Sequence, residues 1–295
     1  MGINKNSLRF LLLAKKSGVD FSKTAMIGRQ TLNMPESHFI DVMNTESGFS
    51  ETTEKWRELY SGRYAEKLLT YLGAEVADSF DFSDYEQASF VHDFNAPISD
   101  EHKNKYTLVI DGGSLEHIFN FPVAMKNCME MTRINGHFIS ITPSNNNFGH
   151  GFYQFSPELF YRVLNYDNGF TVKQMYYYDD KFSPNWKSVI DPDKVRKRVT
   201  LINDKPVMLI LLAQREAIKS IFNKTPQQSD YQAAWEEGSF GEKGKKSSGS
   251  FLSKIKSMLP ITFKIWLDRK INYKPNPEFY KDVNIVNLLR STFSD

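Results

Sequence analysis

The feature that most constrains the fold of this 295-residue chain is a run of β-forming residues that ends at two glycines. Residues 106–110 (YTLVI) form this run, and Asp111, Gly112 and Gly113 follow directly. From residue 24 to residue 143 similar apolar runs alternate with helical patterns at short intervals. This alternation is typical of βα units and predicts an α/β fold with a mostly parallel sheet.

The strands expected from these patterns lie at residues 24–28, 76–81, 90–92, 106–110, 137–143, 170–178 and 206–214. Helices are expected between them. One opens the chain, with Ser7 as a candidate N-cap and Gly18 as its stop, and another ends at Gly136. A later helix has Ser156 as N-cap and Pro157 in its first turn.

Residues 31–60 are polar and irregular in pattern, apart from a helical stretch at 53–60 (TEKWRELY), although connections between strands and helices are commonly 2–6 residues long. We therefore expect a possible lid insertion here, or a surface insertion without that role.

The composition of the sequence changes near residue 217, after which Gln, Ser, Gly and Lys are frequent. We expect a main domain over residues 1–216, a linker or mobile arm over 217–250, and a basic amphipathic segment over 251–295. Residues 243–270 carry eight Lys or Arg against one Asp. This basic segment could be a solvated appendage, a partner-docking arm, or a peripheral membrane contact through residues 251–271.

Composition excludes several classes of protein. The segment 1–214 has 23 Lys or Arg against 26 Asp or Glu, so no broad basic face for nucleic acid is expected. Cys128 is the only cysteine, which forbids an intrachain disulfide and fits a cytoplasmic compartment. No Cys/His spacing predicts a metal site. The apolar run near the N-terminus is too short for a secretory signal, and none reaches membrane-span length.

Polar or small residues follow each expected strand. Ligands of open parallel sheets bind at the carboxyl ends of the strands, so these positions are candidates for a binding site. A carboxylate at Asp81 could accept bonds from ribose hydroxyls, and Asp93 from an exocyclic amine with Phe94 stacked on the base. The alternative is that such residues cap the next helix or hold a turn.

The run YTLVIDGGSLEHIFNFPVAMKNCMEMTRINGHFISITP resembles the fourth strand, following helix and fifth strand of class I S-adenosylmethionine-dependent methyltransferases. The resemblance covers roughly residues 20–215. It implies a doubly wound, mostly parallel, seven-stranded Rossmann-like sheet with a C-terminal appendage, and S-adenosyl-L-methionine as cofactor. The residues that it implies for cofactor binding are Gly28, Arg29, Asp81, Asp93, Phe94, Asp111, Gly112 and Gly113.

The first loop departs from the pattern of this family, which usually has two or three glycines there. In this chain Arg29 and Gln30 follow Gly28. Because S-adenosylmethionine has no phosphates, one glycine could suffice if Arg29 turns away or contacts the methionine carboxylate.

His117 and His150 are the candidate catalytic residues, as bases near the expected methyl group. His117 follows the fourth strand, and His150 lies in a Gly- and aromatic-rich loop in which Tyr153 and Gln154 could bind a hydroxylated acceptor. Glu116 is expected to orient a neighbour or to bind the amino group of the cofactor. Both histidines could instead be structural.

These patterns together predict a methyltransferase that acts on an oxygen or nitrogen of a small-molecule or saccharide (glycan-type) acceptor. The alternative is a catalytically inactive, methyltransferase-like binding or scaffold protein, which the thinned loop at Gly28 favours. A nicotinamide dehydrogenase fits poorly because the Gly-x-Gly-x-x-Gly signature is missing.

Overall fold

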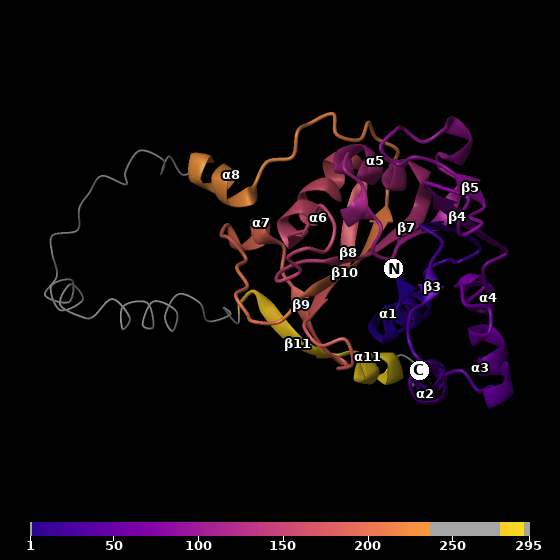
Figure 1. Ribbon diagram of the computed structural model, residues 1–295. Helices are drawn as coiled ribbons and strands as arrows, with labels where there is room; N and C mark the ends of the chain where they lie inside the picture. Colours follow the sequence, from indigo (N-terminus) through magenta and orange to yellow (C-terminus); the bar gives the residue numbers. More distant parts are fainter. Residues whose placement is uncertain (1, 237–277, 292–295) are drawn as a thin grey trace, which may run out of the picture.

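A computed structural model of the chain describes residues 2–236 and 278–291 (Figure 1). One large sheet runs through the described residues, in the order β11-β9-β8-β10-β7-β6-β2-β4-β5. Its strands are β2 (Lys23–Ile27), β4 (Val76–Asp81), β5 (Phe90–Val91), β6 (Tyr106–Asp111), β7 (Thr132–Pro143), β8 (Phe170–Tyr178), β9 (Asn185–Val189), β10 (Met208–Arg215) and β11 (Tyr280–Asn284). A second, two-stranded sheet joins β1 (Gly2–Ile3) to β3 (Thr31–Leu32).

The order of the strands defines a Rossmann-like, doubly wound sheet. The five strands from β7 to β5 are parallel, and the chain proceeds outward from β2 in both directions. β10 runs antiparallel between β7 and β8. The switch of direction lies between β2 and β6, where such sheets bind ligands at the carboxyl ends of their strands.

The seven expected strands are all present, and the α/β prediction is confirmed. The sheet is larger than the seven strands expected, because β9 and β11 extend it beyond β8 through antiparallel pairs. Both additional strands are five residues long.

Helices cover both faces of the sheet (Figure 1). The helices are α1 (Lys5–Lys16), α2 (Glu36–Thr45), α3 (Thr53–Tyr60), α4 (Glu66–Tyr71), α5 (Phe121–Met131), α6 (Pro157–Val163), α7 (Pro192–Val195), α8 (Ser229–Glu236) and α11 (Ile285–Ser291). Neighbouring residues of a strand point to opposite faces. Met26 therefore packs in the core with α1 to α4 and α11, whereas Ala25 packs in the core with α5 and α6.

Two helix boundaries differ from the prediction. α1 begins at Lys5, and Asn4, not Ser7, is its N-cap: the Asn4 side chain accepts from the backbone N–H of Asn6 and Ser7. α5 ends at Met131, five residues before Gly136, because the chain already enters β7 at Thr132. The N-cap at Ser156 is confirmed, since its Oγ accepts from the backbone N–H of Leu159 at 3.3 Å.

Residues 31–60 are mostly helical: α3 confirms the helix expected over residues 53–60, and α2 corrects the irregular loop expected before it. α2 and α3 bury Phe39 and Trp56 completely in the core that contains α1. The indole Nε1 of Trp56 donates to Asn44 Oδ1 at 2.7 Å, which joins the two helices. A lid movement of this segment would have to break this packing.

Part of the expected C-terminal appendage belongs to the main domain. β11 pairs with β9, and α11 packs on α1 through the buried Ile285 and Leu289. The expected linker beyond residue 236 and the basic segment up to residue 277 lie outside the described residues. Within the described ranges, no helix is both long and apolar enough to cross a membrane.

Candidate functional site

A cavity of about 270 Å³ lies where β2, β4, β5 and β6 end. It is lined by the backbone and side chains that follow these strands: Ile27, Gly28, Phe80, Asp81, Phe82, His92, Asp93, Phe94, Asn95, Ser114, His117 and Ile118. The cavity therefore brings together five of the residues expected from the sequence, contributed by four strand ends.

Gly28 is required by its backbone conformation and by its neighbour. Its φ is +72°, in the left-handed region that favours glycine, and its N–H donates to Phe80 O at 2.7 Å. A Cβ at this position would lie 2.7 Å from Ser114 Oγ. The close approach between the end of β2 and the turn that follows β6 thus depends on this glycine.

Gln30 explains why Gly112 is a glycine. The buried Gln30 side chain donates through Nε2 to Ile27 O at 2.7 Å and lies against Gly112, where a Cβ would come within 2.3 Å of Oε1. This oxygen is buried and has no hydrogen-bond partner among the described residues. Gly113, with φ of +93°, completes the turn. The amide of Gln30 therefore occupies space beside the glycine pair.

Arg29 turns away from the cavity. Its Nε contacts Glu66 Oε1 at 2.6 Å, one NH group donates to Glu86 O at 2.7 Å, and the guanidinium lies 4.0 Å from the centre of the Tyr64 ring. These contacts hold the loop that follows β4 against α4. The sequence left two roles open for Arg29: turning away from the loop, or contacting the methionine carboxylate. The position of the side chain matches the first of these.

Asp81 lines the cavity with a carboxylate, and Phe94 lines it with an apolar ring. Asp81 is half-buried at the end of β4, and its Oδ1 accepts from the backbone N–H of Phe82 at 2.8 Å. Phe94 is buried and packs edge-on against Phe80, with ring centres 6.2 Å apart. A carboxylate and an apolar wall on one cavity are suited to a ligand with hydroxyl groups and a flat ring.

Two other strand-end carboxylates hold turns. Asp93 is exposed, and its Oδ1 accepts from the backbone N–H and side-chain amide of Asn95, which lowers its pKa. Asp111 is fully buried, and burial raises its pKa against the opposing effect of its hydrogen bonds. Its oxygens accept from Ser140 Oγ and from the N–H groups of Ser114 and Leu115. Asp111 does not line the cavity, although it shapes the turn beside it.

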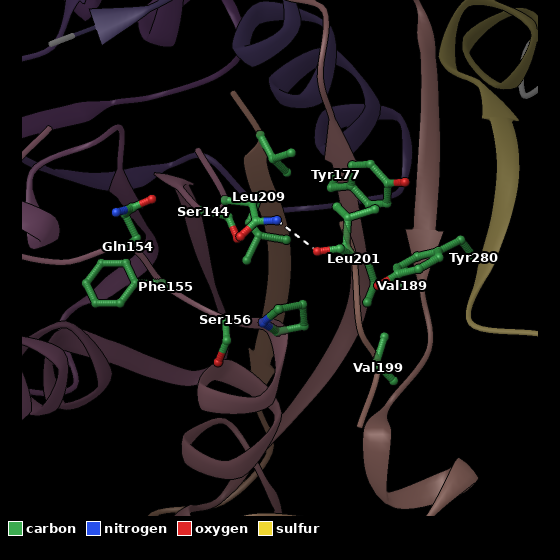
Figure 2. Close-up of a pocket in the computed structure, with 13 residues that line it drawn as sticks. Ser144, Gln154, Phe155, Ser156, Tyr177, Val189, Val199, Leu201, Leu209 and Tyr280 are labelled. Atoms are coloured by element: carbon green, nitrogen blue, oxygen red, sulfur yellow. Dashed lines mark hydrogen bonds between the residues drawn. The ribbon is translucent and has the colours of Figure 1, made fainter. Parts of the chain in front are cut away.

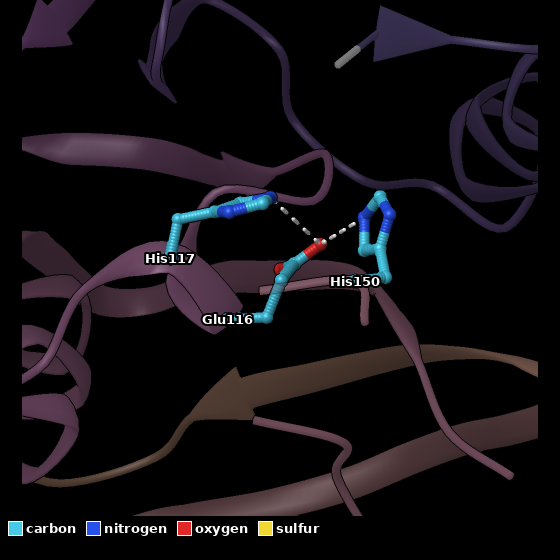
Figure 3. Close-up of side chains that lie close together, drawn as sticks. All are labelled: Glu116, His117 and His150. Carbon is cyan, nitrogen blue, oxygen red and sulfur yellow. Dashed lines mark ion pairs between the residues drawn. The ribbon is translucent and has the colours of Figure 1, made fainter. Parts of the chain in front are cut away.

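The two candidate catalytic histidines meet at one carboxylate (Figure 3). Glu116 Oε1 lies 3.9 Å from His117 Nε2 and 3.5 Å from His150 Nε2. Glu116 is completely buried, whereas both imidazoles are partly exposed. Burial, and next the nearby Asp111, raise the pKa of Glu116 to about 8. Burial, followed by the neighbouring His150, lowers the pKa of His117.

A loop after β7 brings His150 to this position. The backbone N–H of Phe152 donates to Glu116 O at 2.7 Å, and a Cβ on Gly151 would lie 2.7 Å from the same oxygen. The side chains expected to bind an acceptor have partners in this structure: Tyr153 OH donates to Phe119 O at 2.6 Å, and Gln154 Oε1 accepts from the Asn147 N–H.

The same loop continues into a second cavity of about 190 Å³ (Figure 2). This cavity lies over β8, β9, β10 and β11, and most of its walls are apolar, including Tyr177, Leu209 and Tyr280. Asn145 crosses it by donating to Leu201 O at 2.8 Å. Residues 144–157 thus connect the histidine pair to a mainly apolar hollow.

Comparison with known proteins gives structural similarity only. No protein-family model and no curated protein matches the chain. Solved structures similar to it include the N-methyltransferase NodS from Bradyrhizobium japonicum WM9 in complex with S-adenosyl-L-homocysteine, at 9% identity and a TM-score of 0.37, covering 72% of this chain and 87% of NodS. An S-adenosylmethionine-dependent methyltransferase from Mesorhizobium loti has 10% identity and a TM-score of 0.38, covering 68% and 96% of the two chains. The Rossmann-like assignment rests on the strand order itself.

Two residues of the site, Gln30 and Ser114, have roles that sequence reasoning missed, since they touch Gly112 and Gly28. Glu116, which was expected to orient a neighbour or to bind the cofactor, is the buried centre of the histidine pair. The sequence offers one signal, the adjacent Glu116-His117 pair. The burial of Gln30 and the position of His150 depend on contacts between distant segments.

Proposed function

We propose that this protein is an S-adenosyl-L-methionine-dependent methyltransferase that acts on an oxygen or nitrogen of a small-molecule or glycan-type acceptor. The observation that carries this proposal is the cavity at the switch point of the sheet, which combines Gly28, Asp81 and Phe94 with His117. Ligands of doubly wound sheets bind at this position.

The residues of the cavity fit the nucleoside part of the cofactor. Asp81 would accept from ribose hydroxyls, Phe94 and Asp93 would border the adenine, and the backbone at Gly28 would pass close to the ligand. The volume of about 270 Å³ is slightly below the ~300–1,000 Å³ of typical ligand sites, which suits a part of the cofactor. When bound, S-adenosylmethionine supplies an electrophilic methyl group.

The remaining part of the cofactor would extend toward Ser114 and His117. The glycine turn at Gly112 and Gly113 lies on this side, behind the amide of Gln30. His117 and His150 would face the acceptor, because His117 lines the end of the cavity and His150 is its neighbour. Their positions support a catalytic role in orienting or deprotonating the acceptor.

Exposed aromatic rings support a ring-shaped acceptor. Phe148 and Phe152, in the loop that carries His150, are 95% and 65% exposed. Phe119 packs edge-on against Phe152 at 5.7 Å and is itself 72% exposed. Rings of this kind bind the apolar faces of sugars and other flat molecules by packing.

The second candidate function is binding without turnover. The observation that favours it is the side chain of Gln30, which packs on Gly112 where the methionine part of the cofactor is expected. Calorimetry with S-adenosylmethionine and S-adenosylhomocysteine tests whether the protein binds the cofactor that the enzyme needs. Absence of binding at millimolar concentration would reject the enzyme, and, where both bind, methyl transfer to an acceptor separates it from a binding protein.

Asp81 provides the residue-level test of the cofactor site. Asp81→Ala should weaken S-adenosylhomocysteine binding by about 10- to 100-fold, because hydrogen bonds to a charged group contribute about 1.5–3 kcal/mol. Asp84→Ala is the matched control, since Asp84 is an exposed carboxylate on the same loop outside the cavity. Equal affinities of the two variants would show that the ribose assignment is wrong.

We also propose that residues 251–271, which lie outside the described residues, bind anionic membrane surfaces. The support is their composition, in which Lys254, Lys256 and Lys264 alternate with apolar residues.

A further inference from the structure

Glu116, His117 and His150 form a cluster, although the catalytic role proposed above for the two histidines does not use the Glu116 carboxylate. The carboxylate oxygen and one nitrogen of each imidazole lie within 4.8 Å of one another. We propose that these three side chains bind a divalent transition-metal ion, such as Zn²⁺, with a further coordination position open toward the cavity. Two imidazoles and a carboxylate are a ligand set that suits such ions.

The distances fit an ion better than they fit direct hydrogen bonds. The separations of 3.5 and 3.9 Å between Glu116 Oε1 and the two imidazole nitrogens are too long for good hydrogen bonds. Ligand atoms about 2.0–2.1 Å from a tetrahedral Zn²⁺ are about 3.3 Å apart. The cluster therefore needs adjustments of a fraction of an ångström to the carboxylate–imidazole separations.

The buried carboxylate is the second observation that points to an ion. Glu116 has no exposed surface, and its Oε1 lacks a hydrogen-bond partner among the described residues. Its other oxygen accepts a long hydrogen bond from Thr142 Oγ1 at 3.5 Å. A buried polar oxygen without a donor is unfavourable, and a bound cation would offset this penalty. The unpartnered oxygen points at both imidazoles (Figure 3).

The chain fixes this geometry through backbone contacts. Glu116 and His117 lie in a single 3₁₀ turn, η2 (Leu115–His117), directly after the Asp111 turn. The bond from Phe152 N–H to Glu116 O holds the loop that carries His150, and Gly151 permits the close approach. Two segments more than 30 residues apart are thus held together at the point where their side chains converge.

The position of the cluster suggests what the ion would do. His117 lines the cavity assigned to the cofactor, so the open coordination position would face the acceptor. An ion here would bind an acceptor oxygen or nitrogen and orient it, with the imidazoles as ligands rather than bases. This role rests on the proposed methyl transfer, whereas metal binding itself does not.

Metal binding can be measured directly on the full, tag-free chain. After treatment with a chelator and its removal, titration with Zn²⁺ should show a single tight equivalent, and Co²⁺ should give visible absorption bands of a nitrogen- and oxygen-ligated ion. His150→Ala should weaken Zn²⁺ binding by at least about 100-fold, since even partners of a ligand contribute 10- to 100-fold. Glu116→Gln, which keeps the shape of the side chain, should do the same.

His38→Ala is the control, because His38 lies in α2 and outside the cluster. The affinity of this variant for Zn²⁺ should equal that of the wild type. Because His150 lies on a partly exposed loop, its variant should keep the native circular dichroism spectrum. Absence of a tight Zn²⁺ equivalent in the wild type, or unchanged affinity in folded His150→Ala, would overturn the proposal.

The proposals of a metal site and of a cofactor site can be refuted independently of each other. Asp81→Ala should retain Zn²⁺ binding, and His150→Ala should retain S-adenosylhomocysteine binding. Zn²⁺ binding without cofactor binding would leave the metal site intact and reject the methyltransferase proposal.

Discussion

Single glycines in this chain serve different purposes, and the first loop shows the contrast. Gly18 and Gly28 both have positive φ, at +83° and +72°. A Cβ on Gly18 would meet nothing within 4 Å, whereas one on Gly28 would lie 2.7 Å from Ser114 Oγ. Gly18 is therefore required only by its left-handed backbone conformation. Gly28 is required both by this conformation and by the close packing against Ser114.

We expect Gly28→Ala to destabilise the protein more than Gly18→Ala. The left-handed conformation costs about 1–2 kcal/mol for a residue with a Cβ, and both variants carry this cost. Gly28→Ala adds the collision with Ser114. Urea denaturation should show the difference, and it should shrink when the two glycine variants are compared in a Ser114→Ala background. An unchanged difference in that background would exclude the collision as its cause.

The sequence predicts which residues follow the strands but not what their side chains contact. Asp93 and Asp111 could have faced a ligand or a backbone N–H, and the structure pairs both with backbone groups. Local sequence cannot separate these outcomes, because both use the same residue at the same strand end. The sequence likewise does not show the burial of Gln30 against Gly112, since these two residues belong to turns 82 residues apart.

At the scale of elements, the edge of the sheet near β5 contains a buried titratable group. His102 ends the 3₁₀ turn η1 (Asp100–His102) and packs on the rings of Phe80 and Phe90, with centres 4.8 and 4.5 Å away. Burial lowers the pKa of His102, because the charged imidazolium is disfavoured among these rings.

The stability of this edge should therefore fall in acid. Because the folded pKa of His102 lies below the unfolded value of about 6.5, the unfolded chain binds the additional proton. Stability is lost as pH falls through the unfolded value. Denaturation at pH 7.5 and 5.5 should show a smaller loss for His102→Leu than for the wild type, and His38→Gln should behave as the wild type. Equal losses in all three proteins would show that His102 does not contribute.

Periodicity predicted the central elements and missed the peripheral ones. Most of the expected strands, such as β6 and β10, have strong apolar runs, so they are visible in the sequence without knowledge of their partners. β9 contains three charged or polar residues in five and becomes a strand by pairing with β8 and β11. The polar appearance of residues 31–52 likewise conceals α2, whose narrow apolar face buries only a few large side chains.

At the scale of the whole molecule, the proposed membrane contact depends on a segment between two parts of one domain. α8 ends at Glu236, and the chain rejoins the sheet at β11. A truncation at residue 216 would remove β11 and α11 as well as the basic segment, so it would confuse loss of membrane binding with loss of folding. Substitutions within residues 251–271 avoid this difficulty.

We expect the triple variant Lys254→Gln, Lys256→Gln, Lys264→Gln to bind anionic vesicles roughly 100-fold less than the wild type. Each lysine near a charged surface contributes about 1 kcal/mol, or about 3 kcal/mol together. Sedimentation with phosphatidylserine vesicles measures this change, with neutral vesicles as the control. Equal sedimentation of both proteins would exclude these lysines as the membrane contact.

During synthesis of the protein, β9 can pair with β11 only after the residues of β11 have been translated. Lys187 in β9 lies opposite Asp282 in β11, 95 residues later. At translation rates of about 5–20 residues per second, the edge of β9 remains uncovered for about 5–20 seconds after it leaves the ribosome. An uncovered edge strand can pair with another chain. The nascent protein is thus open to association with other chains until β11 has been synthesised and has paired with β9.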